Sequence, residues 1–380
     1  MTWTPPSIAS SDHVYQYPAV FNQAMTDIGS HVNSSAYPHK FPTGWYYADR
    51  SITAKTVSVA ADRYTLTLPN VIDADVGGVS LGLPATVDLN LSLEATWDTI
   101  SGTDYRTAAN RSGRDFFIYL CQPVSGAVPV IKVSANATYP SGYNANNSRK
   151  IGGFPCLCVA AGTISGHPGT GYLAGDIIPN GVWDLKWRCE TLNNAGLAWD
   201  AKSRCWAFIY MASNVGGSPA SVYGGTIWDW INWMDAVDAG AAIGMRLPRD
   251  AEFHCLAALS NEGTNISGSG DPGTTGGHSD TAGRRMISGS FLEDCCGVEW
   301  QWLDEQSYQT GTSGGWNWYD HTSGKGQLYL ANDNADVKLL AGGHWANGAT
   351  CGSRGRDAAN YRWSSASALG FRLVARSISK

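Results

Sequence analysis

Charge is scarce in this chain. Charged residues make up only 15% of its 380 residues, against about 25% in a typical soluble domain. Basic residues number 26 against 32 acidic ones, and no basic run occurs. Binding to a phosphate backbone requires clustered Lys and Arg, so we expect no nucleic-acid partner. Because no run approaches the roughly 18 apolar residues of a membrane span, we expect no membrane insertion.

Targeting signals and cofactor motifs are also missing. The first residues contain neither a basic nor an apolar stretch, which predicts cytoplasmic synthesis without a signal peptide. There is no P-loop, no dinucleotide-binding glycine pattern, no zinc-protease helix and no nucleophile elbow. The eight histidines do not cluster at ligand spacing, and His31 and His39 are isolated. We therefore expect no catalytic residue, no cofactor and no metal.

The nine cysteines do not resemble a secreted disulfide framework, because their number is odd and their positions are scattered. Cys156 and Cys158 lie in an apolar run, which favours buried residues on a strand. Cys295 and Cys296 are adjacent and lack the spacing of a zinc site.

Glycine and tryptophan, in contrast, are abundant, with 44 and 16 residues. So much glycine excludes a helical bundle or coiled coil, and an aromatic content of 11% with a net charge of −6 argues against disorder. The composition predicts a compact, loop-rich protein that favours β-structure.

Alternating apolar and polar residues predict short strands at 64–68 and 87–94, and further strands are expected at 116–121, 128–133 and 154–160. A short helix is expected within residues 12–32. A glycine-rich stretch at 162–176 marks the expected boundary between domains at 1–165 and 166–380. The predicted fold class is α+β, with an N-terminal β-sandwich-like domain.

Most tryptophans lie in the second predicted domain. There, one helix is predicted from Thr226, as N-cap, to Gly240, with apolar residues at helical spacing that include Trp230. A second helix is predicted after Pro248, with acidic residues in its first turn. A strand is expected at 206–210 and a long loop at 260–290, and 291–380 are expected to form short strands and irregular loops.

Three carboxylates near two tryptophans are candidates for acid/base chemistry: Glu299, Asp304 and Glu305. The alternative, which we favour, is that they accept hydrogen bonds from backbone or indole groups.

The segment 340–374 mixes two kinds of residue. Glycines with special backbone freedom and arginines that can pin loops through several donors, Arg354, Arg356 and Arg372, alternate with small, polar or aromatic residues of no hydrophobic period. This pattern is typical of a fixed scaffold that displays a variable surface. A glycine-rich terminal β-region without function fits it equally well.

Four motifs resemble the formylglycine-generating-enzyme branch of the C-type lectin fold. They are Arg246-Leu247-Pro248-Arg249-Asp250-Ala251-Glu252-Phe253, Gly297-Val298-Glu299-Trp300-Gln301-Trp302, Ala341-Gly342-Gly343-His344-Trp345 and Leu369-Gly370-Phe371-Arg372-Leu373. Within that branch, the terminal segment is similar to the variable proteins of diversity-generating retroelements, a family that includes the major tropism determinant of a bacteriophage. In that family a reverse transcriptase rewrites adenine-bearing codons.

The resemblance implies a C-terminal C-type lectin-like domain that binds a ligand through diversified side chains. The template pattern Gly-Gly-Asn-Trp-Asn-Asn-x-x-Asn-x-Gly-Ser-Arg matches from Gly342 without a gap. The variable positions then fall on His344, Ala346, Asn347, Thr350, Asp357, Ala359, Asn360, Ser364, Ala366 and Ala368. Scaffold or flanking residues would be Trp345, Arg354, Tyr361, Trp316 and Trp318, with Tyr319 and His321 nearby. For the aromatic residues at 316–321 the alternative, which we favour, is packing in the core.

The same resemblance offers an enzyme alternative, a formylglycine-generating oxidase. That activity requires two copper-binding cysteines at positions that here read Asn347 and Gly352, and thiolates are what hold copper(I). A second alternative is a fixed structural virion or cell-surface protein of the same fold. The favoured interpretation implies a protein or cell-surface receptor as partner, a place on a virion or bacterial surface, and a homo-oligomer, a trimer if the chain forms a fibre tip.

Overall fold

The structure is a computed structural model that describes residues 45–379 except 49, 70–71, 84, 99–101, 124–127, 192, 309–314, 320–323, 325 and 332–335. The helix predicted within 12–32, His31, His39 and His321 lie outside the described residues. The chain divides into two compact units, Met1–Trp45 and Tyr46–Lys380, and every described residue after Trp45 belongs to the second.

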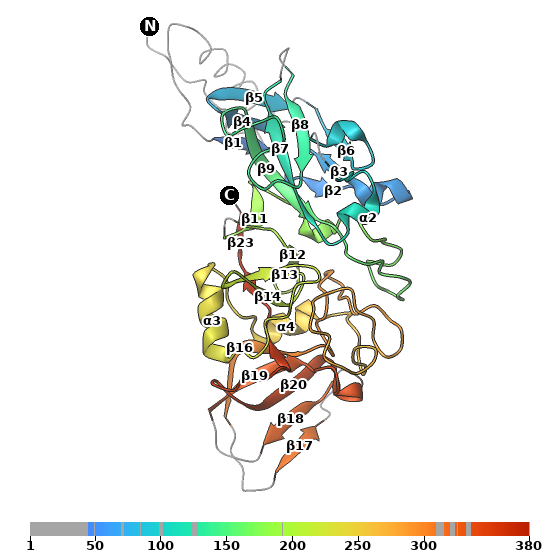
Figure 1. Ribbon diagram of the computed structural model, residues 1–380, viewed down its shortest axis with the longest axis vertical. Coiled ribbons are helices and arrows are strands. Elements are labelled where there is room, and N and C mark those ends of the chain that lie inside the picture. Colours follow the sequence, from blue (N-terminus) through green and yellow to red (C-terminus); the bar gives the residue numbers. More distant parts are fainter. Residues whose placement is uncertain are drawn as a thin grey trace, which may run out of the picture. The chain divides into compact units, whose positions relative to one another are not determined.

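The second unit is mostly β-sheet with few helices (Figure 1). The helices are α2 (Ala108–Arg111), α3 (Trp233–Ala242) and α4 (Asp250–Leu256), with 3-10 turns η2 (Ala60–Tyr64), η3 (Glu94–Thr96), η4 (Pro179–Gly181) and η5 (Gly348–Thr350). No helix among the described residues is both long and apolar enough to cross a membrane.

Residues 46–184 form three sheets around one core. Their strands are β1 (Tyr46–Ala48), β2 (Thr53–Ala54), β3 (Thr65–Leu68), β4 (Ile72–Val76), β5 (Val79–Leu83), β6 (Val87–Asn90), β7 (Asp115–Cys121), β8 (Val130–Ser134), β9 (Ser148–Pro155) and β10 (Trp183–Asp184). The sheet orders are β1-β4-β5, β2-β3-β6 and β10-β9-β7-β8. Alternate side chains such as Ile72, Ala74 and Val76 are buried, as the period of a half-buried strand requires. Strand β10 pairs with β9, and the core shared by these three sheets includes Val182. The domain boundary at 165/166 stays a prediction.

The strand predicted at 87–94 is shorter than expected. It ends at Asn90, where Leu91 donates its N–H to the carbonyl of Tyr64 and accepts the indole N–H of Trp97. Leu91 is therefore buried outside a strand, while Leu93 is exposed. Cys156 and Cys158 are buried as predicted and all nine cysteines are free thiols, but the strand predicted at 154–160 is wrong, because β9 ends at Pro155 and Cys156 forms only an isolated bridge to Ile177.

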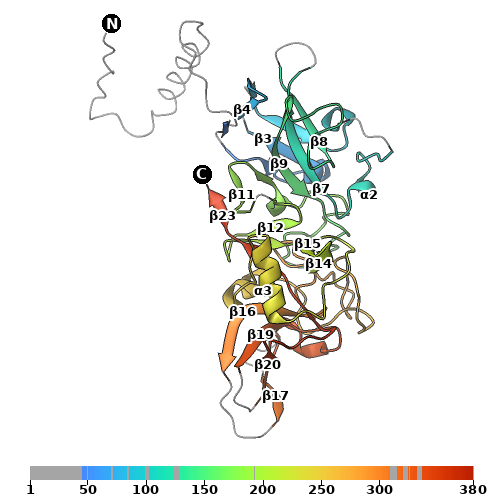
Figure 2. The same cartoon turned by 60° about the vertical axis from the view of Figure 1, so that its left-hand side comes forward.

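The rest of the unit is built from smaller sheets and one large sheet. Its strands are β11 (Trp187–Cys189), β12 (Leu197–Asp200), β13 (Cys205–Phe208), β14 (Ala212–Val215), β15 (Ser218–Ser221), β16 (Trp300–Tyr308), β17 (Trp316–Tyr319), β18 (Leu328–Ala331), β19 (Asp336–Gly342), β20 (Gly352–Tyr361), β21 (Leu369–Gly370), β22 (Val374–Ala375) and β23 (Ser377–Ser379). The large sheet has the order β17-β18-β20-β19-β16-β21 and is coloured orange to red in Figure 1. Helix α3 lies beside β16, and Trp233 donates its indole N–H to the Leu303 carbonyl of that strand at 2.9 Å (Figure 2).

The helix predicted from Thr226 to Gly240 begins too early. Thr226 and Ile227 form isolated β-bridges, and Trp230 has a left-handed backbone with φ 52°, so this stretch is not helical. Tertiary hydrogen bonds overrode the helical spacing of the side chains. The helix starts at Trp233, and Gly240 lies within it rather than at its end. The second prediction is confirmed, since α4 follows Pro248 with Asp250 and Glu252 in its first turn.

The true N-cap of α3 is Asn232, whose side-chain oxygen accepts the N–H of Asp235 at 3.0 Å. We expect Asn232→Ala to lower the free energy of unfolding by about 1 kcal/mol, because one N–H of the first turn loses its partner. Thr226→Ala is the control. Thr226 is exposed and caps nothing in the structure, so its replacement should change stability by less than about 0.5 kcal/mol in urea unfolding. Equal losses in both variants would contradict the observed helix start.

Candidate functional site

The segment 340–374, which the sequence singles out, passes through the middle of the large sheet. Its strand β20 lies between β18 and β19, parallel to the first and antiparallel to the second. The register with β19 shifts twice, once near Gly342, which has a φ of 94°. A Cβ at Gly342 would lie 2.4 Å from the Cys295 carbonyl oxygen, so only glycine fits. The backbone of this segment is thus held on both sides.

Arg356 fixes the beginning of β20 from inside. It is 7% exposed, its guanidinium pairs with the Asp250 carboxylate, and it donates to the carbonyls of Ser353 and Gly355. Burial lowers the pKa of Arg356, while Asp250 acts in the opposite direction. The guanidinium also lies over the Phe253 ring, 5.2 Å from its centroid. Because Asp250 and Phe253 belong to α4, this arginine joins the helix to the strand.

Arg372 fixes the end of the segment. Its side chain is fully buried and donates to the backbone carbonyls of Phe208, Ile209 and Glu293 and to the side-chain oxygen of Gln301. Arg354, in contrast, is exposed. Of the three arginines considered from the sequence, two therefore pin the segment from the interior.

Four candidate positions lie in the loop before β20, at His344, Ala346, Asn347 and Thr350. Ala346 is exposed and the other three are half-buried. The loop is held by its own hydrogen bonds, because the side chain of Asn347 accepts the N–H of His344 at 2.8 Å and its carbonyl accepts the hydroxyl of Thr350 at 2.9 Å. Burial lowers the pKa of His344. The backbone of the scaffold residue Trp345 in the same loop is also held, since its N–H donates to the carbonyl of Val298 at 3.0 Å.

Three candidate positions lie on β20 itself, at Asp357, Ala359 and Asn360. The two last are half-buried, but Asp357 is only 8% exposed. Its carboxylate accepts the N–H of Ala359 at 2.6 Å and the side-chain amide of Asn360 at 3.1 Å. Burial raises the pKa of Asp357 to about 6. Its side chain therefore organises the strand more than it meets solvent.

The last three positions, Ser364, Ala366 and Ala368, lie in the loop between β20 and β21, and all are half-buried. The carbonyl of Ala366 accepts the N–H of Trp230 at 3.1 Å, and that of Ala368 accepts the N–H of Trp300 at 2.9 Å. These bonds use the backbone only, so they leave the side chains exchangeable.

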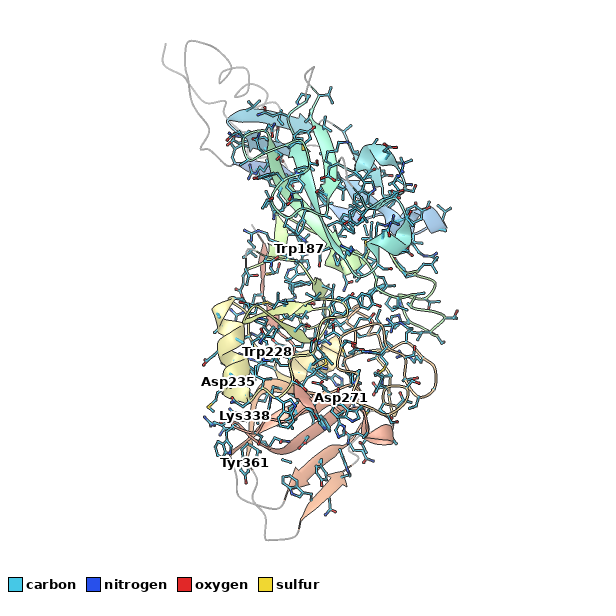
Figure 3. All side chains as sticks on the ribbon, viewed as in Figure 1. Trp187, Trp228, Asp235, Asp271, Lys338 and Tyr361 are labelled. Atoms are coloured by element: carbon cyan, nitrogen blue, oxygen red, sulfur yellow. The ribbon has the colours of Figure 1, made fainter. Side chains whose placement is uncertain are left out.

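Exposed aromatic rings surround these positions. Tyr361 and Trp363 stack with their centroids 5.0 Å apart and their planes 5° apart, and Trp363 is 60% exposed. Figure 3 labels Tyr361 beside Lys338, the residue paired with Asn360 in the neighbouring strand. Trp230 is 66% exposed. On β17, Trp316 and Trp318 are about 40% exposed and contact the ring of Tyr329.

Trp230 and Trp363 have a surface exposure that the sequence did not predict. Trp230 was expected on the apolar face of a helix that does not form there, and Trp363 stands among the candidate positions without matching the template pattern. The position of Trp363 inside the segment was a signal for it. Nothing in the sequence marked Trp230, whose exposure follows from its left-handed backbone and its bond to Ala366.

Of the three candidate carboxylates, Glu299 differs from expectation. It is 1% exposed, and neither of its side-chain oxygens has a hydrogen-bond partner among the described residues. The prediction that it accepts hydrogen bonds is therefore wrong; its Oε2 lies near Gly370, where a Cβ would meet both this oxygen and the methyl group of Met211. Burial raises its pKa well above the usual range, and the charges of Asp229 and Asp271 add to this. Asp304 is exposed on β16 and Glu305 is half-buried.

In the part of the chain that the structure describes, no three His, Cys, Asp or Glu side chains are grouped to hold a metal ion. Cys351, which neighbours one of the two copper positions considered from the sequence, is buried and donates a hydrogen bond to the carbonyl of His344, and burial raises its pKa to about 12.

The comparisons with known proteins agree on one group of relatives. Residues 82–184 match the family described as the Mtd second domain. The "Tail fiber receptor-binding protein" of Bordetella phage BPP-1 is 25% identical over 340 residues, which cover 82% of each chain. The chain resembles the major tropism determinants over most of its length. The family resemblance predicted from the C-terminal motifs is confirmed.

Solved structures show the same fold. The Major Tropism Determinant U1 Variant superposes with a TM-score of 0.66 and 22% identity, covering 89% of this chain and 87% of that one. The P3c Variant gives 0.65 and 23% over the same shares. The family match at 82–184 lies in a region for which the sequence analysis predicts no role. The structural superposition covers 89% of the chain and so extends over both halves of the described unit.

Proposed function

We propose that this chain is a non-enzymatic receptor-binding protein that acts on a virion. The observation that carries the proposal is the match along 82% of the chain to a tail fibre receptor-binding protein of a phage. The related proteins carry the names of receptor-binding and tropism-determining proteins, and none of those names denotes an enzyme. The oxidase alternative has no copper-binding cysteines to support it, since Asn347 and Gly352 occupy those positions.

The binding surface is formed by nine of the ten candidate positions within 344–368, with Asp357 buried beneath it, and a retroelement diversifies the segment. This assignment is supported by how the segment is held. Its backbone is fixed by β18 and β19, by Arg356 and by Arg372, while eight of the ten side chains are half-buried and Ala346 is exposed. A rigid backbone spares the ordering cost of binding, so exchanged side chains alter specificity without unfolding the domain.

The proposal also includes the domain organisation and the oligomeric state. Residues 1–165 form an N-terminal β-sandwich-like domain, and residues 166–380 form a C-type lectin-like domain of α+β class. Several candidate positions carry Ala or Ser, which makes a single copy a weak binder. A homo-oligomer, a trimer at a fibre tip, would compensate through avidity. The partner is a protein or another cell-surface receptor, and no nucleic acid takes part.

The diversification claim has a direct genomic test. A near-copy of the coding segment for 342–374 should lie close to the gene, differing only at adenines and accompanied by a reverse-transcriptase gene. A genome that contains no such copy contradicts the claim, and leaves a fixed receptor-binding or structural protein of the same fold.

The surface itself is tested by bulky substitutions. We expect Ala346→Arg with Ser364→Arg to weaken adsorption of the purified, labelled protein to susceptible bacterial cells by at least about tenfold, because each new side chain is large enough to block close contact. The midpoint of thermal unfolding should stay unchanged. Ala109→Arg, an exposed alanine on α2, is the matched control and should bind like the wild type. Unchanged adsorption of the double variant would place the receptor elsewhere.

A further inference from the structure

One hollow in this unit is lined by arginines and tryptophans. Its volume is about 540 Å³, within the range of sites that hold small ligands. Trp187 of β11 and Trp199 of β12 form one wall, with their ring centroids 4.9 Å apart and their planes at 77°. Both rings are half-buried and contact the buried ring of Trp206. Figure 3 labels Trp187 far from Tyr361, so the hollow is separate from the proposed receptor surface.

Four arginines line the same hollow, namely Arg204, Arg246, Arg249 and Arg376. Glu252 is the acidic side chain among the lining residues, and it is already engaged in two hydrogen bonds with Arg246, at 2.6 and 2.7 Å. The other three arginines are exposed, and the described residues provide no ion-pair partner for their side chains.

Two further carboxylates lie beside lining residues: that of Glu190 accepts the backbone N–H of Arg376, and that of Asp200 accepts the backbone N–H of Ser203. Because Arg246 and Glu252 neutralise each other, the lining charges left without an ion-pair partner among the described residues are those of Arg204, Arg249 and Arg376.

Two features of the residues that line the hollow do not stabilise the fold. Arg204 has a left-handed backbone with φ 57°, a conformation in which glycine is the less strained residue. The turn that imposes it is fixed by Asp200, which accepts the N–H groups of Ser203 and Arg204 through its side chain and its carbonyl. Ser203 also lines the hollow, and its hydroxyl is buried without a hydrogen-bond partner among the described residues.

We propose that this hollow binds a small anionic ligand that carries a phosphate group on a ring, such as a phosphorylated sugar. Guanidinium groups match phosphate oxygens through paired N–H donors, and the two indoles offer an apolar wall for the ring. The shared chemistry is a phosphate on a saccharide, whether it comes from a surface glycan or from a free metabolite. The proposal does not depend on the receptor surface, since none of the ten candidate positions lines the hollow.

The test uses the full-length protein with four probes, namely glucose 6-phosphate, a phosphorylated glycan fragment, inorganic phosphate and glucose. Quenching of tryptophan fluorescence and isothermal titration calorimetry report binding. We expect glucose 6-phosphate to bind most tightly, inorganic phosphate more weakly and glucose not measurably at millimolar concentration. Binding should weaken as salt rises, because the contacts are ionic. A phosphorylated glycan fragment that binds no more tightly than glucose 6-phosphate would place the specificity in the phosphate and its ring alone.

Arg204→Gln with Arg376→Gln should weaken the affinity for glucose 6-phosphate by at least about tenfold, since two charge-assisted contacts are lost. Arg249→Gln is a second, independent variant with the same expected direction. Arg114→Gln is the matched control, an exposed arginine that stacks on Tyr105 and does not line the hollow. All four residues are exposed, so these variants should fold, which thermal unfolding verifies. The proposal is overturned if no phosphate probe binds at millimolar concentration, if glucose binds as well as its phosphate, or if the arginine variants bind like the control.

Discussion

Arg372→Met is expected to lower the free energy of unfolding by about 3–5 kcal/mol, the largest effect of any single substitution in the terminal segment. The guanidinium is fully buried and satisfies the carbonyls of Phe208, Ile209 and Glu293. Methionine fills much of the space but donates nothing, so three buried carbonyl groups lose a partner that water cannot replace. Equilibrium unfolding in urea, followed by circular dichroism, measures the difference.

Arg354→Met is the matched control, because Arg354 belongs to the same segment and is exposed. Its free energy of unfolding should stay within about 0.5 kcal/mol of the wild type. If Arg372→Met were equally mild, the interior anchoring of the segment would be wrong. A variant that lost stability should also lose adsorption to cells in proportion to its unfolded fraction, while its folded fraction keeps the native surface.

Glu299→Met is expected to have the opposite effect and to stabilise the protein by about 1–3 kcal/mol at pH 8. The carboxyl group is buried without a partner among the described residues, beside Met211, and burial together with Asp229 and Asp271 raises its pKa well above the usual range. A carboxyl group with a raised pKa in the native state holds a proton that the unfolded chain releases near pH 4. The native state is therefore favoured at low pH, and this advantage is lost as the pH rises toward the raised pKa.

The measurement is the difference in free energy of unfolding between the variant and the wild type, taken from pH 5 to pH 8. The difference should grow in favour of the variant as the pH rises. In the wild type the buried carboxyl group must either keep its proton or ionise away from water, and both cost free energy at high pH, whereas the variant has no such group. Taking the difference removes the contributions of other carboxyl groups with raised pKa values, such as Asp115 and Glu293. Glu305→Met, a half-buried position on the same strand, is the control and should show a flat difference. A flat difference for Glu299→Met would show that the carboxyl group has a partner in solution.

Several elements could be predicted from the sequence because their signals are local. The strand at 116–121 appears as β7, and the helix after Pro248 appears as α4, since a short apolar run and a proline followed by acidic residues need no distant partner to be recognised. The family resemblance could also be predicted, because its four motifs keep their order and spacing. The ten candidate positions came from that pattern alone and stay predictions.

The failures share a physical cause, which is competition from distant backbone groups. Residues 226–231 have the spacing of a helix, yet Trp228 donates its N–H to the carbonyl of Ala212 and Trp230 donates to that of Ala366. Such bonds join parts of the chain that are far apart in sequence, so no local pattern contains them. The same holds for Glu299, whose lack of a partner among the described residues depends on what packs around it, and for the exposure of Trp230.

The sequence by itself determined that this is a glycine-rich, tryptophan-rich, charge-poor β-protein whose terminal segment follows a template pattern, because composition and motif spacing are properties of the chain. Only the tertiary structure decided which arginines anchor that segment, that Asp357 is turned inward, and that four arginines and two tryptophans from five separate segments meet at one hollow. Burial and convergence arise from contacts between distant residues, and those contacts exist only once the sheets have formed.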